Sequence, residues 1–381
     1  MKVSGDWLDH PGTQAVCAAL QAAGFRALFV GGCVRNAVLG VPVGDVDLTT
    51  DAPPQEVTRV AEAAGFKVIP TGIDHGTVTV VAGGKPHEVT TFRRDLETDG
   101  RRAVVAYSTR IEEDAERRDL TMNALYADSD GQLIDPLGGL ADTLARRVRF
   151  VGEPETRIRE DYLRILRFFR FHACYGDPEG GLDAEGLAAC AALAEGLETI
   201  SRERIGAEMR KLLGAGDPAP AMAAMAQSGV LARVLSGADP KALAPLVHLE
   251  AGIPPNWLRR LAVLGGEDPA QSLRLSRAET RDLSLLRQSV EGTEGPAALG
   301  FLLGAKLAQD ALLARAAHLE QPLPQGGMAE IMRGARTPFP VVAADLMPGL
   351  SGAALGARLK ALEAAWLASG LRLSREELLN S

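Results

Sequence analysis

The chain has 381 residues and a formal net charge of −8, and 46% of its residues are hydrophobic. This length and apolar content allow two or three packed units, each with a core of its own. The negative charge excludes a uniformly basic coat for nucleic acid, but it does not exclude local basic surfaces, because a partner responds mainly to the nearby field. The four cysteines form no CxxC pair and accompany no histidine cluster, which excludes a disulfide framework and a zinc site.

The apolar runs and the N-terminus bear on the compartment of the protein. We recognise no apolar run of membrane-spanning length and no signal-peptide core in the N-terminal MKVSGDWLDH. Cysteines without a disulfide pattern fit a reducing compartment. The expectation is therefore a soluble, cytoplasmic protein with no membrane partner.

In the first 150 residues, short β-rich runs alternate with helical ones. Proline starts and glycine stops punctuate these runs as they do in helices. The predicted elements, in chain order, are a strand over 26–30, a Gly–Gly turn and a helix to Leu39, a strand over 45–50, a helix from Pro53 to Gly65, strands over 66–70, 76–83 and 87–92, and a helix over 114–125.

Beyond about residue 152 the chain is rich in Ala and Leu, and almost all of it has a helical pattern. The predicted fold class is α+β, a head with a mixed sheet followed by all-α units. We place the head at 1–150, a helical neck at 151–220, and a helical body and tail at 221–381.

A pair of carboxylates stands in the sequence GDVDLTT. Side chains alternate along a strand, so Asp45 and Asp47 would leave the same face about 7 Å apart at the backbone. Two like charges held together need a cation, and oxygen ligands with open positions suit Mg²⁺ that also carries water and substrate phosphate. Two such ions can activate an attacking hydroxyl and stabilise a leaving phosphate. A solvated turn with two acidic residues is the alternative interpretation.

Upstream of this pair, a predicted strand runs into Gly31 and Gly32 and then into a helix with Arg35 on its first turn. Glycines let the backbone approach phosphate closely, and the N–H groups of a helix start attract anions. Together with the carboxylates, this arrangement predicts a phosphate cradle beside a metal site, whereas the turn alone would indicate only turn geometry. Glu88, on a later predicted strand, is a candidate third carboxylate unless it faces water on an edge strand.

The segment RRDLTMNAL places Arg118, Asp119 and Asn123 within about one turn of a predicted helix. Arg118 is a candidate ligand for a triphosphate oxygen, and Asp119 or Asn123 for ribose hydroxyls. An exposed, charged helix start is the alternative interpretation of the same residues.

The segment EDYLRILRFFRF predicts a helix with an apolar stripe along one side. Asp161, Arg164, Arg167 and Arg170 follow one another at intervals of three residues on the opposite side. Arginines on one face repel one another unless an anion binds there, and phosphate meets that need. A solvated charged face is the alternative.

Asp161 and Arg164 also offer a way to read a base. Cytosine and adenine each present an exocyclic amine donor beside a ring acceptor, whereas guanine and uracil present the reverse order. A carboxylate beside a guanidinium therefore accepts C and A, and it leaves buried polar groups unpaired with G and U. Such a pair would replace a template base.

The chain contains, in order, the segments FVGGCVRNAVLG, GDVDLTT, EVTTFRRD, RRDLTMNALY, DPLGGLADT, EDYLRILRFFRF and ERIGAEMRKLL. This series resembles the motifs of class II tRNA nucleotidyltransferases, the family of CCA-adding enzymes and bacterial poly(A) polymerases, over roughly residues 25–215. The resemblance implies a polymerase-β-like nucleotidyltransferase head on helical neck, body and tail domains, with tRNA gripped by the tail. It further implies CTP and ATP as substrates and Mg²⁺ as cofactor, and it implies no protein partner.

The resemblance also implies roles for single residues. One departure is Asn36, where the family usually has Asp after the motif arginine. By position, Gly32 and Arg35 would contact the nucleotide, Asp45 and Asp47 would hold magnesium, Arg118 would bind triphosphate, Asp161 and Arg164 would read the base, and Arg167 and Arg170 would complete the nucleotide contacts.

The predicted function is the template-independent addition of C, C and A to the 3′ end of tRNA by two-metal nucleotidyl transfer, with release of pyrophosphate. The alternatives are a poly(A) polymerase, an enzyme that adds only CC or only A, and a non-catalytic tRNA-binding protein. A compact chain without a basic C-terminal extension favours CCA addition over poly(A) synthesis. The segment ETDGRRA (97–103) resembles the flexible element linked to the C-to-A switch in this family.

Overall fold

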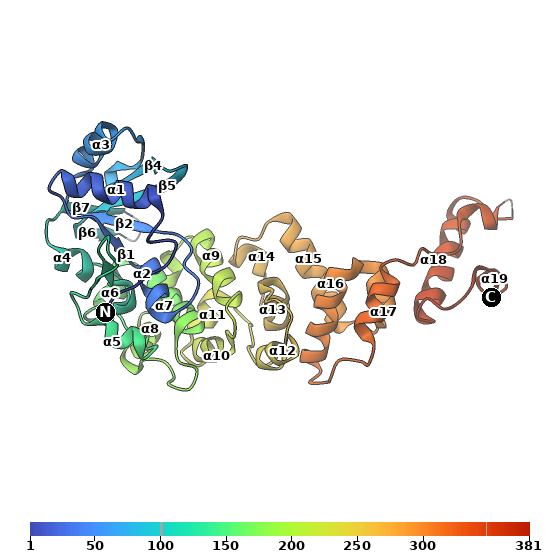
Figure 1. Ribbon diagram of the computed structural model, residues 1–381. Helices are drawn as coiled ribbons and strands as arrows, with labels where there is room; N and C mark the ends of the chain where they lie inside the picture. The colour runs from blue at the N-terminus through green and yellow to red at the C-terminus, as the bar shows by residue number, and fades with distance from the viewer. Residues whose placement is uncertain (100–101, 348) are drawn as a thin grey trace. The chain divides into compact units, whose positions relative to one another are not determined.

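Seven strands of the N-terminal region form one mixed sheet in the order β3-β4-β5-β2-β1-β8-β9. Figure 1 labels β1, β2, β4 and β5 of this sheet among the helices of the region. β2 and β5 run parallel, and the other neighbours run antiparallel. The predicted α+β class with a mixed sheet is thus confirmed. In the computed structural model, which describes residues 1–99, 102–347 and 349–381, the strands of this sheet are β1 (Leu28–Val30), β2 (Asp47–Thr50), β3 (Lys67–Gly72), β4 (Thr77–Ala82), β5 (Lys85–Thr91), β8 (Tyr126–Ala127) and β9 (Leu133–Ile134).

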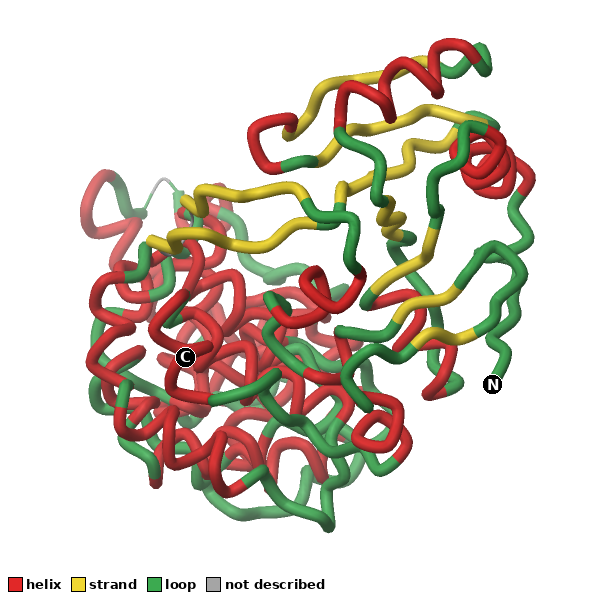
Figure 2. The backbone as a smooth tube through the Cα atoms, turned by 90° about the vertical axis from the view of Figure 1, so that its left-hand side faces the viewer, coloured by secondary structure: helices red, strands yellow, loops and turns green. Residues whose placement is uncertain are grey.

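The central strand β1 contributes to a core on each face of the sheet, because its side chains alternate. Phe29 packs in one core with apolar residues of α1 and α3. Leu28 and Val30 pack in the other core with Phe92 and Tyr126. Figure 2 shows the strands of this region together with the helices beside them. The helices of the region are α1 (Pro11–Ala22), α2 (Gly32–Leu39), α3 (Pro54–Ala63), α4 (Ile111–Glu116) and α5 (Gly139–Leu144).

The predicted helix over 114–125 is wrong. α4 ends at Glu116, and a short 3-10 turn, η2 (Thr121–Asn123), follows after a gap. Leu120 and Met122 are both fully buried although they are two residues apart. That spacing is typical of extended backbone, since a helix would turn the two side chains to different faces.

The predicted helix over 160–171 is interrupted. α6 (Pro154–Glu160) ends just before Asp161, whose backbone is extended with φ −156° and ψ 104°, and α7 (Leu163–Tyr175) begins two residues after Asp161. The Asp161 carboxylate accepts a hydrogen bond from the backbone N–H of Leu163 at 3.1 Å. Aspartate competes for nearby backbone groups in this way and therefore favours helix ends over helix interiors.

The described chain from α6 to the C-terminus contains helices and short 3-10 turns but no strand, as the composition predicts. The chain divides into two compact units, residues 1–205 with 227–233, and residues 206–226 with 234–381. The boundaries at 150 and 220 stay predictions. The remaining helices are α8 (Ala184–Ala192), η3 (Ala194–Thr199), α9 (Arg202–Leu213), α10 (Ala219–Gln227), α11 (Val230–Val234), α12 (Leu243–Leu249), α13 (Trp257–Leu264), α14 (Pro269–Ser272), α15 (Arg277–Glu291), α16 (Pro296–His318), α17 (Gly327–Gly334), η4 (Ala343–Leu346), α18 (Gly352–Ala368) and α19 (Arg375–Leu379).

The second unit contains a buried ionic network. Arg259 and Arg260 are only 2% and 1% exposed, and both donate to Glu250 just beyond α12. Arg259 also pairs with Asp310 of α16, and Arg260 donates to the carbonyl of Leu213 at the end of α9 at 2.7 Å. Buried charges must be paired in this way to offset the cost of removing them from water. The network therefore connects α13 to three other parts of this unit.

Among the described helices, α16 is the one long and apolar enough to cross a membrane by length and composition, and the sequence analysis overlooked it. Gly304, with φ 74° and ψ 166°, interrupts the helix. More than half of the apolar stretch, 56%, is buried inside the protein. Leu299 and Leu312 pack in a core with Ile331 of α17. An interrupted, buried helix of this kind is typical of a protein core.

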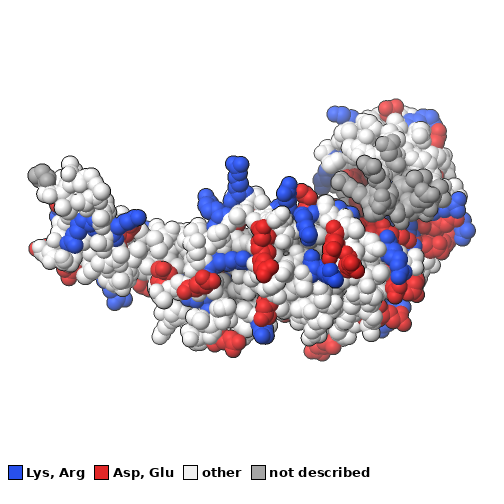
Figure 3. All heavy atoms as spheres, turned by 180° about the vertical axis from the view of Figure 1, so that it is seen from behind, with Lys and Arg blue, Asp and Glu red and all other residues white. Residues whose placement is uncertain are grey.

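Charges of both signs are interspersed on the surface. Figure 3 shows Lys and Arg beside Asp and Glu across the visible face, among the residues drawn in colour. Several of these are short-range helix pairs, such as Arg59 with Glu56 and Arg333 with Glu330. Exposed pairs of this type contribute little to stability, so they leave the arginines available to other partners.

Candidate functional site

Strands β2 and β5 bring carboxylates side by side. Asp47 is the first residue of β2 and pairs in parallel register with Glu88 of β5. Asp45 lies outside the hydrogen-bond ladder, so the strand predicted over 45–50 starts two residues too early. The two aspartates are therefore not alternate residues of one strand, and the predicted same-face spacing does not apply to them. Pro42 and Gly44 precede Asp45, and proline cannot donate to a ladder while glycine weakens a strand.

The pKa of the Asp47 carboxyl is raised above its ordinary value. Desolvation of the carboxyl by the surrounding protein is the largest cause, and the negative charges of Glu88 and Asp45 act in the same direction, against the lowering effect of Arg118. A bound cation would relieve this repulsion. Within the described chain, no group of three or more His, Cys, Asp or Glu side chains is arranged to hold a metal ion. The donor set nevertheless fits a hard cation such as Mg²⁺, which takes one or two carboxylates and completes its shell with water and substrate phosphate.

The turn between β1 and α2 requires glycine at its first position. Gly31 has φ 72° and ψ −119°, and a Cβ there would stand 3.4 Å from Nη1 of Arg118. α2 begins at Gly32, and among the described residues no side-chain cap hydrogen-bonds to its N-terminal N–H groups. Such groups bind anions readily. The predicted sequence of strand, Gly–Gly turn and helix is confirmed, and its role as a phosphate cradle stays a prediction.

Arg35 is only 6% exposed, and protein groups hold its guanidinium. Nε and Nη2 donate to Asn36 Oδ1 at 3.1 and 2.9 Å, Nη2 donates to the hydroxyl of Tyr175 at 2.9 Å, and Nη1 donates to Asn123 Oδ1. The guanidinium carbon also lies 4.1 Å from the ring centre of Tyr175. A guanidinium has five N–H donors, so these four bonds leave one for a ligand. Arg35 therefore fits a single contact to the nucleotide, not a bidentate grip on phosphate.

Arg118 is bound to a fully buried carboxylate. Its Nη2 lies 3.0 Å from Asp114 Oδ2, and its Nε donates to the hydroxyl of Tyr126 at 3.1 Å. Tyr126 donates to the same carboxylate at 2.8 Å, and Arg117 pairs with it at 2.7 Å. Burial alone would raise the pKa of Asp114, but the two arginines hold it at about 2. The sequence analysis missed Asp114 and Tyr126, although arginines three and four residues after an aspartate are a recognisable helical signal.

Asp119, Asn123 and Arg167 form a second cluster, next to the first. Asn123 Nδ2 donates to Asp119 Oδ1 at 2.9 Å, and Arg167 of α7 donates to Asp119 Oδ2 at 2.6 Å. Burial opposes ionisation of Asp119, but Arg167 and the hydrogen bond from Asn123 lower its pKa to about 2. Asp119 and Asn123 thus already have protein partners, and a ribose hydroxyl would have to share or replace those bonds.

Asp161 and Arg164 have different side-chain partners in the described structure. Asp161 Oδ2 accepts from Arg204 of α9 at 2.6 Å, and Arg164 donates to Glu160 Oε2 at 2.6 Å. The two residues meet through the backbone, where the N–H of Arg164 donates to the carbonyl of Asp161 at 2.9 Å. The proposed reading of a base by this pair stays a prediction, and it requires both side chains to turn from these partners toward the base.

Three arginines of the site lie close to one aromatic ring of α7. The guanidinium carbons of Arg35, Arg167 and Arg170 lie 5.0, 5.3 and 4.5 Å from the ring centre of Phe171. Such stacking stabilises cations and keeps the guanidinium planes in place. Neither Phe171 nor Tyr175, one turn later, was among the residues predicted from the sequence to belong to the site. Their spacing of four residues on α7 was the available signal.

A separate two-stranded sheet carries the segment 97–103. Strands β6 (Arg93–Asp99) and β7 (Arg102–Tyr107) pair antiparallel, with Asp99 opposite Arg102. Residues 100 and 101 lie outside the described residues. The switch role of this segment therefore stays a prediction.

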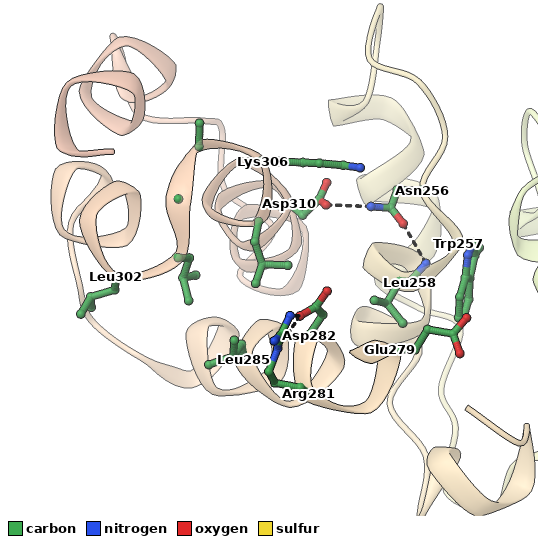
Figure 4. Close-up of a pocket in the computed structure, with 14 residues that line it drawn as sticks. Asn256, Trp257, Leu258, Glu279, Arg281, Asp282, Leu285, Leu302, Lys306 and Asp310 are labelled. Atoms are coloured by element: carbon green, nitrogen blue, oxygen red, sulfur yellow. Dashed lines mark hydrogen bonds and ion pairs between the residues drawn. The ribbon is translucent and has the colours of Figure 1, made fainter. Parts of the chain in front are cut away.

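The second unit has a pocket of about 680 Å³ between α13, α15 and α16 (Figure 4). Figure 4 shows the exposed Lys306 extending toward Asn256, above Asp310. Trp257 also lines the pocket, and the guanidinium of Arg210 lies over its ring at 5.0 Å. The carboxylates of the lining are each paired with an arginine. A lysine and an aromatic ring at one hollow are typical of single-stranded or looped nucleic-acid contacts.

Two family models match the chain. Residues 27–149 match the poly A polymerase head domain, and residues 182–241 match a probable RNA and SrmB-binding site of polymerase A. The head-domain match and the fold together define the class, a nucleotidyltransferase with a mixed-sheet head and a helical remainder. Nucleotidyltransferases of this family generally use divalent metal ions.

Relatives along most of the chain define the family. The chain is 34% identical to a mouse protein, CCA tRNA nucleotidyltransferase 1, mitochondrial, over 92% of this chain and 85% of that protein. It is 41% identical to a CCA-adding enzyme of Geobacillus thermodenitrificans, over 63% of this chain and 54% of the relative. This chain therefore belongs to the family of CCA-adding enzymes, also named CCA tRNA nucleotidyltransferases, as its motifs predict.

Solved structures agree with this membership. The CCA-adding enzyme of Bacillus stearothermophilus in complex with CTP has a TM-score of 0.73 and 30% identity, covering 94% of this chain and 92% of that chain. The Thermotoga maritima CCA-adding enzyme complexed with tRNA has a TM-score of 0.70 over 100% of this chain and 98% of that chain. Its identity is 18%, so it supports the fold.

Proposed function

We propose that this protein adds C, C and A in turn to the 3′ end of tRNA, taking nucleotides from CTP and ATP without a nucleic-acid template. The observation that carries this proposal is the 34% identity to a CCA tRNA nucleotidyltransferase over 92% of the chain. The in-register pair of Asp47 and Glu88 beside the Gly31 turn supports it, because phosphoryl chemistry needs such carboxylates next to an anion site. Solved relatives in complex with CTP, ATP and tRNA fit the same substrates.

The proposed reaction is an in-line displacement. The 3′ hydroxyl oxygen of the tRNA attacks the α-phosphorus of the nucleotide, the bond from that phosphorus to the bridging oxygen breaks, and pyrophosphate leaves. Mg²⁺, when bound, would activate the hydroxyl and neutralise the developing charge. Asp45 and Asp47 would hold it, with Glu88 as a third candidate. Arg118, beside the turn at Gly31, would face the triphosphate.

Recognition of the incoming base is assigned to α7 and to Asp161, which lies two residues before it. We assign Asp161 as the acceptor for the exocyclic amine of C or A and Arg164 as the donor to the ring nitrogen. Arg167 and Arg170, stacked on Phe171, complete the contacts to the nucleotide. A cation stacked on an aromatic ring loses little freedom when it binds phosphate, which supports this assignment.

The helical body and tail at 221–381 are proposed to bind tRNA. The neck at 151–220 is proposed to read the nucleotide base, and the head at 1–150 to bind metal and carry out catalysis. The pocket with Lys306 and Trp257 supports an RNA contact in this part. We also propose the cytoplasm as the compartment. None of the four cysteines is in a disulfide, which fits a reducing environment, and cell fractionation tests this assignment.

One assay tests the reaction. The protein is incubated with tRNA that ends at the discriminator base and with labelled CTP and ATP, and the product length is read on a gel. We expect three added nucleotides and then a stop. Long tails made from ATP alone would identify a poly(A) polymerase, products of two C or one A would identify a partial activity, and no incorporation would identify a non-catalytic tRNA-binding protein.

A further inference from the structure

Asn36 contacts two parts of the site at once. Its Oδ1 accepts both hydrogen bonds from Arg35, at 3.1 and 2.9 Å, and its Nδ2 donates to the carbonyl of Pro42 at 2.8 Å. Its own backbone carbonyl accepts from the N–H of Val41 at 3.0 Å. One half-buried side chain therefore holds a buried arginine and the turn that follows α2.

The turn held by Asn36 leads directly to Asp45. Pro42 is bound through its carbonyl, and Val43 and Val46 pack against the core of the sheet. Asp45 lies between these anchors, is exposed, and has no place in the strand ladder of β2. Its position relative to Asp47 therefore depends on the anchors of the turn, because no ladder hydrogen bond sets it.

The amide group of Asn36 satisfies both contacts, and an ionised carboxylate cannot. An amide accepts at its oxygen and donates at its nitrogen, whereas an ionised carboxylate only accepts. Aspartate at position 36 would still bind Arg35, but its second oxygen would face the carbonyl oxygen of Pro42. Alanine would lose both contacts. The two substitutions therefore separate the contact with Arg35 from the contact with the turn.

We infer that Asn36 is a positioning residue that couples Arg35 to the segment carrying Asp45, and that it thereby sets the spacing of Asp45 and Asp47 for a divalent cation. This inference rests on the proposed function of the two aspartates. Its distinctive consequence is that loss of the Pro42 contact affects the cation, while loss of the Arg35 contact affects the nucleotide.

The experiment compares Asn36→Asp and Asn36→Ala with the unaltered protein and with Asn380→Asp, which makes the same amide-to-carboxylate change at an exposed position near the C-terminus. Hydrogen exchange of the peptide 40–46 reports the turn, and Mn²⁺ titration followed by electron paramagnetic resonance reports the cation. We expect faster exchange and about fivefold weaker Mn²⁺ binding in both Asn36 variants, the effect of one lost hydrogen bond. The KM for CTP should rise more in Asn36→Ala than in Asn36→Asp.

Several results would overturn the inference. The first is unchanged hydrogen exchange or unchanged Mn²⁺ affinity in Asn36→Ala, a variant that adds no charge. The second is an equal effect of Asn380→Asp on either measurement. The third is a lack of Mn²⁺ binding by the unaltered protein. A lower melting temperature without a change in Mn²⁺ affinity would show a merely structural role and would also overturn it. Exchange and Mn²⁺ binding use neither tRNA nor nucleotide, so a failure of CCA addition would refute the proposed function separately.

Discussion

Individual carboxylates in the first unit differ in pKa according to their desolvation and to the charges beside them. The pKa of Asp47 is raised by desolvation and by the nearby Glu88, whereas arginines hold the pKa values of Asp114 and Asp119 at about 2 although both carboxylates are buried. A carboxylate among other carboxylates is stabilised by a cation, while one already paired with arginine has little to gain from it. This contrast supports Asp47 as a metal ligand and Asp114 as a support for Arg118.

Asp47→Asn should lower CTP incorporation at least a hundredfold while the protein stays folded. Removing one charged ligand costs several kcal/mol of transition-state stabilisation, on the order of 3 or more. Steady-state kinetics measures the loss, and circular dichroism checks the fold. Asp9→Asn, at an exposed carboxylate of the same unit, serves as the matched control and should retain activity. Activity of Asp47→Asn within about tenfold of the unaltered protein would refute the metal assignment.

Asp161→Ala should reduce the preference for CTP over UTP. A polar pair that reads a base contributes about 1–3 kcal/mol of discrimination, or roughly 10- to 100-fold. The measurement is kcat/KM for both nucleotides, with Glu155→Ala on the exposed side of α6 as control. An unchanged ratio in a folded variant would leave Asp161 as a partner of Arg204 and would remove it from base recognition.

At the scale of elements, two helix ends create the charged clusters of the site. α4 ends at Glu116, so Arg117 and Arg118 lie at its C-terminal end and fold back onto Asp114. α6 ends before Asp161, so the arginines of α7 start a new helix. The pairs of Asp114 with Arg117 and Arg118 keep the i,i+3 and i,i+4 spacing of a helix. The break at Asp161 instead lets its carboxylate accept from the backbone N–H of Leu163 and from Arg204.

The cluster at the end of α4 predicts a pH dependence of stability. The pKa of Asp114 falls from 3.8 to about 2 on folding, so its ionised form stabilises the protein above about pH 4 and that contribution is lost as the pH falls toward 2. The expected loss is about 2 kcal/mol in the free energy of unfolding. Urea denaturation between pH 5 and pH 2 measures it. Asp114→Asn should be less stable at pH 7 and should lack this part of the acid dependence; an identical acid dependence would contradict the assignment.

At the scale of the whole molecule, a protein with a net charge of −8 has to bind an RNA substrate that is itself negatively charged. Most arginines near the two sites described are already bound to carboxylates, as with Arg118, Arg167 and Arg259. Binding of RNA therefore depends on a limited number of cations that face solvent, because phosphate contacts dominate affinity for nucleic acids. Lys306 at the pocket of the second unit is such a cation.

Lys306→Glu should weaken tRNA binding several-fold and lower the slope of log K against log salt by about 1, since one phosphate contact is lost. Filter binding over a range of salt concentrations measures both quantities. Lys67→Glu makes the same charge reversal at an exposed lysine of β3 in the first unit. Equal weakening by Lys67→Glu would attribute the effect to net charge, and no weakening by Lys306→Glu would exclude the pocket from tRNA contact.

The sequence by itself determined the class of fold, the family and most of the strands, because alternation, helix punctuation and motif order are recorded in adjacent residues. It also supplied candidate site residues such as Asp47 and Arg118, but not Asp114 or Tyr126. Only the tertiary structure decided their partners: Tyr175 for Arg35, which is 140 residues away, Glu88 for Asp47, and Arg204 for Asp161. Local patterns contain no information about which distant side chain completes a hydrogen bond, since that choice depends on how the whole chain packs.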